Sequence, residues 1–184
     1  MNEQGAPIDE FIFTSNAVRE IVEAVENEQA EGRIRFATRL VGRWNLLTAH
    51  EINTVADGPE PVLALMNLAR DSVGAVALIT DSAVCYQGET DRVKRQPACA
   101  FEAFIRIKLE AGFDRVQVRE ALRQLEGYRG SCLVEGSNYE ILLEVGANSG
   151  DKLSSRIQLV RNTQGVRRPL DVSLAEYSDS EPCP

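Results

Sequence analysis

The sequence predicts an α+β protein with a mainly antiparallel sheet of about five strands and helices packed on one face. Three observations predict this class. Apolar residues recur at helical spacing in some segments and alternate with polar residues in others. The predicted helices and strands come in runs rather than in strict alternation. Turn residues such as glycine, serine and asparagine separate the strand segments.

The N-terminal part of the chain is predicted to be helical. Valine and isoleucine recur at helical spacing over about 15–31, and Gly32 is typical of the residue that ends a helix. The next segment, 33–46, fits a helix and a strand, because its arginines and apolar residues are spaced for either. We favour a helix, since nothing breaks the run before Asn45.

Two more helices are predicted before the first strand. Thr48 and Glu51 have the spacing of a capping box, in which both side chains bind backbone N–H groups at a helix start. This helix is expected to run to about residue 56. Pro61 suits the first turn of another helix, which is apolar on most sides and therefore expected to be buried.

The first strand is predicted from a continuous apolar run over 74–80, extending to 86. Apolar and polar residues alternate over 101–110, as in a half-buried strand. A long hairpin between these two strands is the simplest pairing. Asp114 then caps a helix predicted over 115–126.

Three further strands are expected to form an antiparallel meander. They are predicted over 129–135, 139–145 and 155–161. Apolar residues also alternate near Val172, where the chain can add an edge strand.

The length of 184 residues fits one domain. We expect a polar leader over 1–10, a single α+β domain over 11–162 and a polar, partly mobile tail over 163–184. No internal repeat is visible in the sequence.

The chain is acidic, with a formal net charge of −8. This charge disfavours binding to nucleic acid and to anionic lipid. No apolar run is long enough for a transmembrane helix, and the polar start lacks the features of a secretory signal. These features predict a cytoplasmic protein. The four cysteines stand far apart, and we expect free, buried thiols, which agrees with that compartment.

His50 is the only histidine. His50 and Glu51 begin like the zinc-protease motif, but position 54 is Thr, so the second histidine ligand is missing. No phosphate-binding glycine motif is present either. The sequence therefore predicts no cofactor, no metal and no catalytic residue.

Arginines are the most distinctive charged residues, 17 against 3 lysines. A basic stripe could contact a phosphate, a nucleic acid or an acidic partner, and the alternative is a solvated face paired with the Glu-rich helix before it. We favour the paired face. The candidate contacts with a partner or nucleic acid are Arg33, Arg35, Arg39, Arg43, Arg92, Lys94 and Arg95.

Few reactive residues and no catalytic motif favour a non-catalytic protein-interaction, assembly or regulatory subunit of a bacterial or phage system. A protein partner or a homo-oligomer is expected, because candidate edge strands could extend a sheet in another chain. One alternative is a nucleic-acid-associated protein that uses the arginines. The other is a small enzyme built on carboxylates such as Asp81 with Glu102.

Overall fold

A computed structural model describes residues 8–52, 57, 59–74, 77–86, 99–135 and 137–176. These residues form eight strands and four helices. The chain forms two compact units, 1–88 and 89–184. The boundary between the units lies inside the predicted 11–162 domain.

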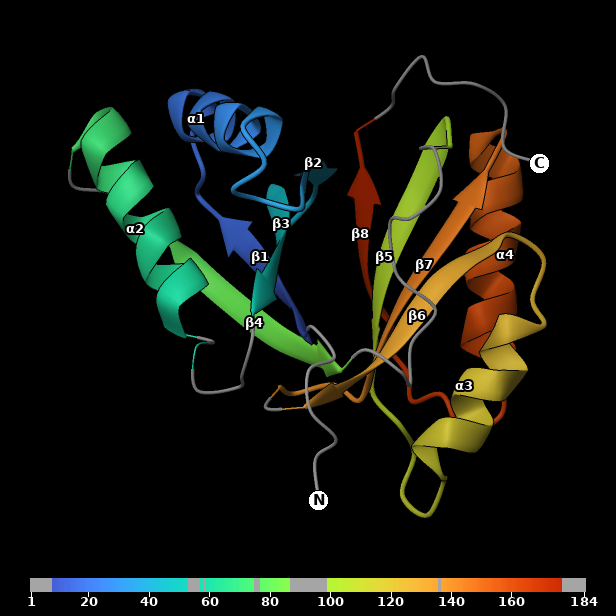
Figure 1. The fold of residues 1–184 in the computed structure, drawn as a ribbon. Helices are drawn as coiled ribbons and strands as arrows, with labels where there is room; N and C mark the ends of the chain where they lie inside the picture. The colour runs from blue at the N-terminus through green and yellow to red at the C-terminus, as the bar shows by residue number, and fades with distance from the viewer. Residues whose placement is uncertain are drawn as a thin grey trace. The chain divides into compact units, whose positions relative to one another are not determined.

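The first unit is a four-stranded antiparallel sheet with two helices (Figure 1). Its strands lie in the order β2-β3-β1-β4. Its elements are β1 (Ile8–Ser15), α1 (Arg19–Ala30), β2 (Phe36–Val41), β3 (Leu46–Ile52), α2 (Pro59–Val73) and β4 (Ile79–Tyr86).

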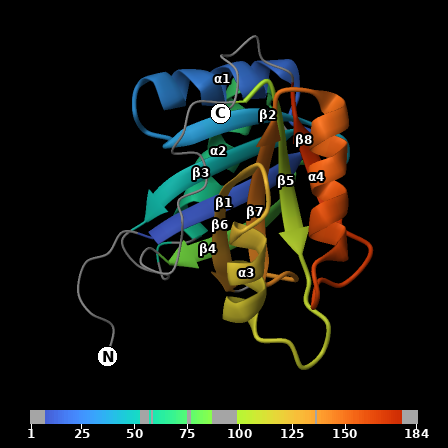
Figure 2. The same cartoon turned by 90° about the vertical axis from the view of Figure 1, so that its right-hand side faces the viewer.

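The second unit repeats this arrangement. Its antiparallel strands lie in the order β8-β5-β7-β6. Its elements are β5 (Phe101–Ile107), α3 (Arg115–Arg123), β6 (Tyr128–Glu135), β7 (Ile141–Ala147), α4 (Gly150–Asn162) and β8 (Asp171–Ala175). Figure 2 shows α3 and α4 lying over the sheet of this unit.

Both units therefore follow the order β-α-β-β-α-β, which is the ferredoxin-like arrangement. The absence of a visible sequence repeat therefore does not extend to the fold. The two units share the order and pairing of their strands rather than their residues.

The core of the first unit lies between its sheet and its two helices. Ile12 and Leu46 on the sheet pack with Ile21 and Val25 of α1 and Leu65 of α2. All five side chains are buried. The stripe of valine and isoleucine that predicted the first helix is thus the stripe that α1 buries.

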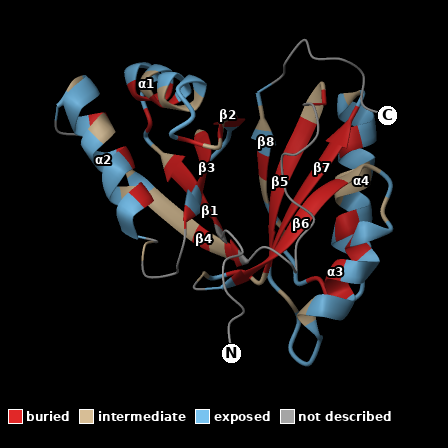
Figure 3. Cartoon of the chain, viewed as in Figure 1, coloured by how far each residue is buried: buried red, intermediate tan, exposed pale blue. Residues whose placement is uncertain are grey.

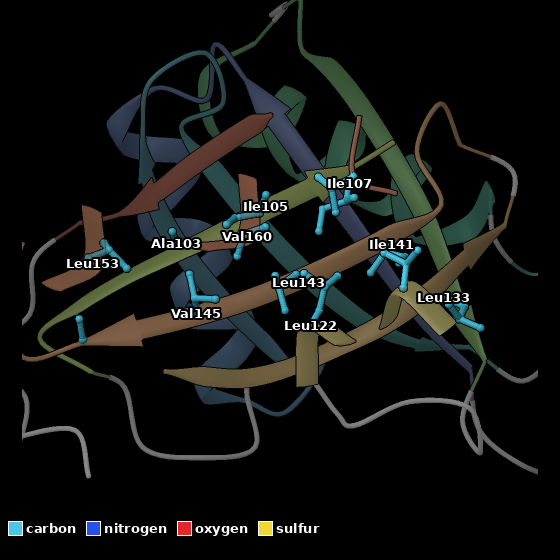
Figure 4. Close-up of a cluster of buried hydrophobic side chains, with 13 residues drawn as sticks. Ala103, Ile105, Ile107, Leu122, Leu133, Ile141, Leu143, Val145, Leu153 and Val160 are labelled. Atoms are coloured by element: carbon cyan, nitrogen blue, oxygen red, sulfur yellow. The ribbon is translucent and has the colours of Figure 1, made fainter. Parts of the chain in front are cut away.

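The core of the second unit has the same position between its sheet and its helices. Alternate residues of β5 face α3 and α4, and Figure 4 shows these side chains converging with those of β7. In Figure 3 β5, β6 and β7 of this unit are mostly buried, and its helices expose their outer surfaces. The cluster includes Ala103, Ile105, Ile107, Leu122, Leu143, Val145, Leu153 and Val160.

Several predictions are confirmed. The α+β class, the helix after Asp114 and the strands β5, β6, β7 and β8 are present. The Asp114 side chain accepts hydrogen bonds from the backbone N–H groups of Val116 and Gln117, at 2.9 and 3.0 Å. Gly32 has a φ of 78° directly after α1, as a helix-ending glycine requires.

The prediction of a helical N-terminal part is wrong, because the first described element is the strand β1. The helices expected over 33–46 and from Thr48 to about residue 56 are also wrong. Most of these residues form β2 and β3, and β3 pairs with β1 and β2. Strand pairing on both sides overrides a local capping pattern.

Two further predictions fail in the second half of the chain. The segment expected as a strand over 155–161 belongs to α4, whose N-cap is Ser149. The long hairpin of 74–86 with 101–110 does not form, because β4 pairs with β1 and β5 pairs with β7 and β8. The fold therefore has two ferredoxin-like units and more strands than the five expected.

The helix α2 is present as predicted, but it is not buried on most sides. Leu63 is 57% exposed and Met66 is 42% exposed. Only Pro61, Leu65 and Ala69 of this helix are buried.

Candidate functional site

A buried polar cluster lies on the helix-facing side of the first unit's sheet. We call Glu10, Thr14, Thr48 and His50 the polar cluster. They share this side with Ile12 and alternate with residues that face the other way. None is more than 8% exposed.

The second unit shows that the fold does not need polar residues at the corresponding positions of the two central strands. Counted from the start of β1 and of β5, Glu10 corresponds to Ala103, and its cross-strand partner His50 corresponds to Val145. The next positions on this side of the second unit are also apolar, with Ile105 opposite Leu143 and Ile107 opposite Ile141. Burying polar groups costs free energy unless they are well paired. Folding alone therefore does not explain why these buried positions are polar.

His50 is a neutral imidazole at physiological pH, because burial lowers its pKa to about 4. Its Nε2 atom lies 3.0 Å from the Thr48 hydroxyl oxygen. Among the described residues, none bonds to the other ring nitrogen, Nδ1. Nδ1 can therefore form a hydrogen bond with a bound molecule.

Glu10 lies directly across from His50 in the pairing of β1 with β3. Burial raises the pKa of Glu10 to about 7, and a hydrogen bond with Ser82 opposes this shift. Within the described part of the chain, its Oε2 atom has no hydrogen-bond partner. A carboxyl whose neutral form is favoured by burial and a neutral imidazole thus face the same helix layer.

A pocket with two adjoining lobes opens at His50. One lobe has a volume of about 340 Å³ and the other about 360 Å³, and both are lined by Arg33, His50 and Ala64. These volumes fall in the range of small-molecule sites in proteins. The pocket forms where the pairing of β2 with β3 has ended, because the last pair joins Phe36 to Ala49.

The two lobes differ in polarity. The first has an apolar wall made by Ile34, Leu65 and Leu68. The second lies at the start of α2 and is bordered by Glu51, Asp57 and Glu60, beside Pro61. Among the residues that the structure describes, five carboxylates and one guanidinium line the two lobes. The carboxylates are Glu28, Glu51, Asp57, Glu60 and Asp71, and the guanidinium is that of Arg33.

The predicted arginine stripe does not form one surface in the first unit. Arg33 pairs with Glu28 and Glu31. Arg39 pairs with Glu26 of α1, with Nε and Oε1 2.9 Å apart. These are the contacts with the Glu-rich helix that the sequence favoured.

Arg35 and Arg43 have different surroundings. The Arg35 side chain is 17% exposed, and its Nε atom lies 3.1 Å from Asp9. Its guanidinium also lies over the ring of Phe36, 5.0 Å from the ring centroid. Arg43 lies over Trp44, at 5.1 Å. Arg33 is the one member of this group that lines the His50 pocket.

The other predicted contact residues, Arg92, Lys94 and Arg95, lie outside the described residues. Asp81 and Glu102, proposed as paired carboxylates, belong to different units. Asp81 lies on β4 and Glu102 on β5.

The expectation of free cysteine thiols is wrong. Cys85, Cys99 and Cys132 are disulfide-bonded, and each is 2% exposed. The apolar surroundings that predicted buried thiols are present, but the sequence spacing does not reveal which cysteines meet in space.

Two searches of the described residues find nothing. No helix there is long and apolar enough to span a membrane. In the same ranges, no group of three or more histidine, cysteine or carboxylate side chains is placed to hold a metal ion.

No protein-family model and no curated protein sequence matches the chain. Several solved structures are similar to it, and three of them illustrate the similarity. A mutant chlorite dismutase from Candidatus Nitrospira defluvii, in complex with cyanide, has a TM-score of 0.57 at 11% identity, over 95% of this chain and 92% of that one. The siroheme decarboxylase NirDL has a TM-score of 0.66 at 7% identity, over 93% and 74%. A haem-binding protein from Thermus thermophilus has a TM-score of 0.53 at 9% identity, over 95% and 92%.

The chain has a chlorite dismutase-like fold. At these identities the similarity extends to the fold alone, and the function has to be argued from the residues of this chain.

Sequence reasoning missed Glu10 and the pocket. Glu10 falls in the predicted polar leader, although Phe11, Ile12 and Phe13 follow it directly. An acidic residue next to such an apolar run is a signal for a buried carboxyl. His50 is distinctive as the only histidine, but the capping pattern predicts it in a helix rather than in a strand.

Proposed function

We propose that the chain is a non-catalytic regulatory protein whose first unit binds a small molecule in the His50 pocket. The observation that carries the proposal is the contrast between the two units. At the positions of β5 and β7 that correspond to Glu10 and His50 the second unit is apolar, whereas the first unit holds the polar cluster there, beside a pocket that reaches His50. A group that a fold does not require, next to a cavity, is expected at a binding site.

Binding is favoured over catalysis by the positions of Glu10 and His50. Glu10 is 2% exposed and is not among the residues that line the pocket. A bound molecule therefore contacts His50, and Glu10 lies behind it. A general acid or base must lie within hydrogen-bond reach of the reacting group. Glu10 does not lie within that reach of a molecule in the pocket.

A tetrapyrrole, the group in the names of two structural neighbours, does not fit this pocket. His50 is the only histidine, and its Nε2 atom already lies beside Thr48. The five carboxylates of the pocket would also repel the carboxylates that such a group carries. No part of the proposal depends on a tetrapyrrole.

The test uses the single histidine as its reporter. The imidazole C–H signals of His50 are unique in the NMR spectrum of the untagged full chain, so a library of small molecules can be screened against them. We expect at least one class of compound to shift these signals in a saturable way. No saturable shift from any class would contradict the proposal.

Ala64 offers a matched control, because it is exposed on α2 and lines both lobes. Ala64→Leu fills the pocket and should abolish the shift. Ala121→Leu places the same side chain at an exposed helical alanine of the second unit and should leave the shift unchanged.

Association with a protein partner or a second copy remains a prediction. A groove of about 710 Å³ beside α2 is lined by Leu63, Met66 and Leu78, among others, and offers apolar surface for it. The molar mass in solution, measured by light scattering, tests this prediction, and a strict monomer that captures no partner would count against it.

Nucleic-acid binding also remains a prediction. The pairing of Arg33 and Arg39 with glutamates weakens it. The cytoplasmic location stays a proposal, and it loses the support of free thiols, because disulfide bonds are typical of oxidising compartments.

A further inference from the structure

We infer that the His50 pocket binds an organic cation: an amine in its ammonium form attached to an apolar body of a few carbon atoms. This inference rests on the proposed binding function and names the chemical class of the ligand. Three features of the pocket carry it, and each corresponds to one part of such a molecule.

The charge of the pocket selects a cation. The one guanidinium among its described lining residues, that of Arg33, is already held by Glu28, with Nη2 and Oε1 2.7 Å apart, and by Glu31. Glu51 and Glu60 on the second lobe lie at exposed positions of β3 and α2. Several carboxylates around one concave site attract a cation and repel an anion.

The first lobe matches an apolar body. Ile34 is 6% exposed and Leu65 is 2% exposed, so the wall that they form with Leu68 is fixed by the core of the unit. Burying a short alkyl chain against such a wall is favourable by the hydrophobic effect. A small inorganic cation would leave this lobe unfilled.

His50 supplies the third feature, since it lies at both lobes and is nine-tenths buried. Its neutral ring can accept a hydrogen bond at Nδ1 when Nε2 donates to the Thr48 hydroxyl. An ammonium group has only donors, so it complements this acceptor. The pocket therefore combines an acceptor, negative charge and an apolar wall.

The experiment compares three probes that share one alkyl chain: hexylammonium, hexanol and hexanoate. The His50 imidazole signals of the full chain are followed by NMR as each probe is added. We expect hexylammonium to bind in a saturable way, hexanol to bind more weakly, and hexanoate to cause no shift. Added NaCl should weaken the binding of hexylammonium and leave that of hexanol unchanged.

Two variants separate local charge from net charge. Glu51→Gln with Glu60→Gln should weaken hexylammonium binding about fivefold and leave hexanol binding unchanged. Glu20→Gln with Glu120→Gln alters the net charge equally at exposed helical positions outside the pocket, and should have no effect. Both double variants keep His50, so the same signals report on them.

The outcomes distinguish this inference from the proposed function. Hexanoate or hexanol binding as tightly as hexylammonium would overturn the cation inference and leave a small-molecule site at His50. No saturable shift with hexylammonium would also overturn it, and the wider library then decides the proposed function.

Discussion

At the scale of single residues, Glu10 and His50 carry opposite shifts in pKa although they are cross-strand partners. Burial is the main cause of both, because it disfavours the charged form of each group. The pKa of Glu10 is raised to about 7 and that of His50 is lowered to about 4. At pH values between these two, both groups are neutral in the folded chain.

The shifts predict opposite pH dependences of stability. Glu10 makes folding less favourable as the pH rises from its ordinary pKa of 4.5 to about 7, because only the unfolded state ionises there. His50 makes folding less favourable as the pH falls from 6.5 to about 4, because only the unfolded state is protonated there. Between pH 4.5 and 6.5 the two slopes cancel in the wild type.

Single variants should reveal each slope. The free energy of unfolding of the wild type minus that of Glu10→Gln should fall by at most roughly 3 kcal/mol as the pH rises from 4.5 to 7. The same difference for His50→Gln should fall by a similar amount as the pH drops from 6.5 to 4. Urea denaturation over this pH range measures both, and flat difference profiles would show that neither pKa is shifted.

The polar cluster should also cost stability at neutral pH. Replacing both partners with apolar residues, as Glu10→Leu with His50→Leu, mimics the apolar pair of the second unit. We expect the double variant to be more stable than the wild type by roughly 1–3 kcal/mol and to lose hexylammonium binding. Thermal and urea unfolding measure the gain. A large loss of stability would mean that the cluster serves the fold.

At the scale of elements, the sequence predicted best where local signals and tertiary packing agree. Asp114 caps α3, and alternation over 101–110 predicted β5. The prediction from sequence failed at β3. There Thr48 and Glu51 resemble a helix start, but the segment lies between β1 and β2. Pairing between residues distant in the chain decides such a strand, and no local pattern contains that information.

The cap of α3 gives a prediction at this scale. Asp114→Ala leaves the N–H groups of Val116 and Gln117 without their acceptor, and should destabilise the chain by about 1 kcal/mol. Asp114→Ser, which keeps a capping oxygen, should retain most of the stability. Equal losses in urea denaturation for the two variants would show that the cap contributes nothing.

At the scale of the whole molecule, the α+β class was predictable, and the division into two ferredoxin-like units was not. The strand order is shared by the units, but Glu10 and His50 correspond to Ala103 and Val145, so residue identity conceals the repeat. Of the candidate site, the sequence singles out His50 as the only histidine and Arg33 as a candidate contact residue. Their convergence depends on the path of β3 and α2, which the sequence does not give.

The disulfide bonds are a second property of the whole chain that sequence spacing concealed. Cys85, Cys99 and Cys132 should resist iodoacetamide in denaturant without reductant, and should become alkylated after reduction. Mass spectrometry of the digested protein measures this. Alkylation of these three cysteines in the unreduced protein would restore the expectation of free thiols.

The inference that most needs a direct test is that the pocket beside the polar cluster of the first unit binds an organic cation. A crystal structure of the full chain soaked in hexylammonium tests it most directly. We expect the alkyl chain to lie against Ile34 and Leu68, with the ammonium nitrogen near His50 and the carboxylates of Glu51 and Glu60. An empty His50 pocket at a saturating concentration of the probe would contradict it.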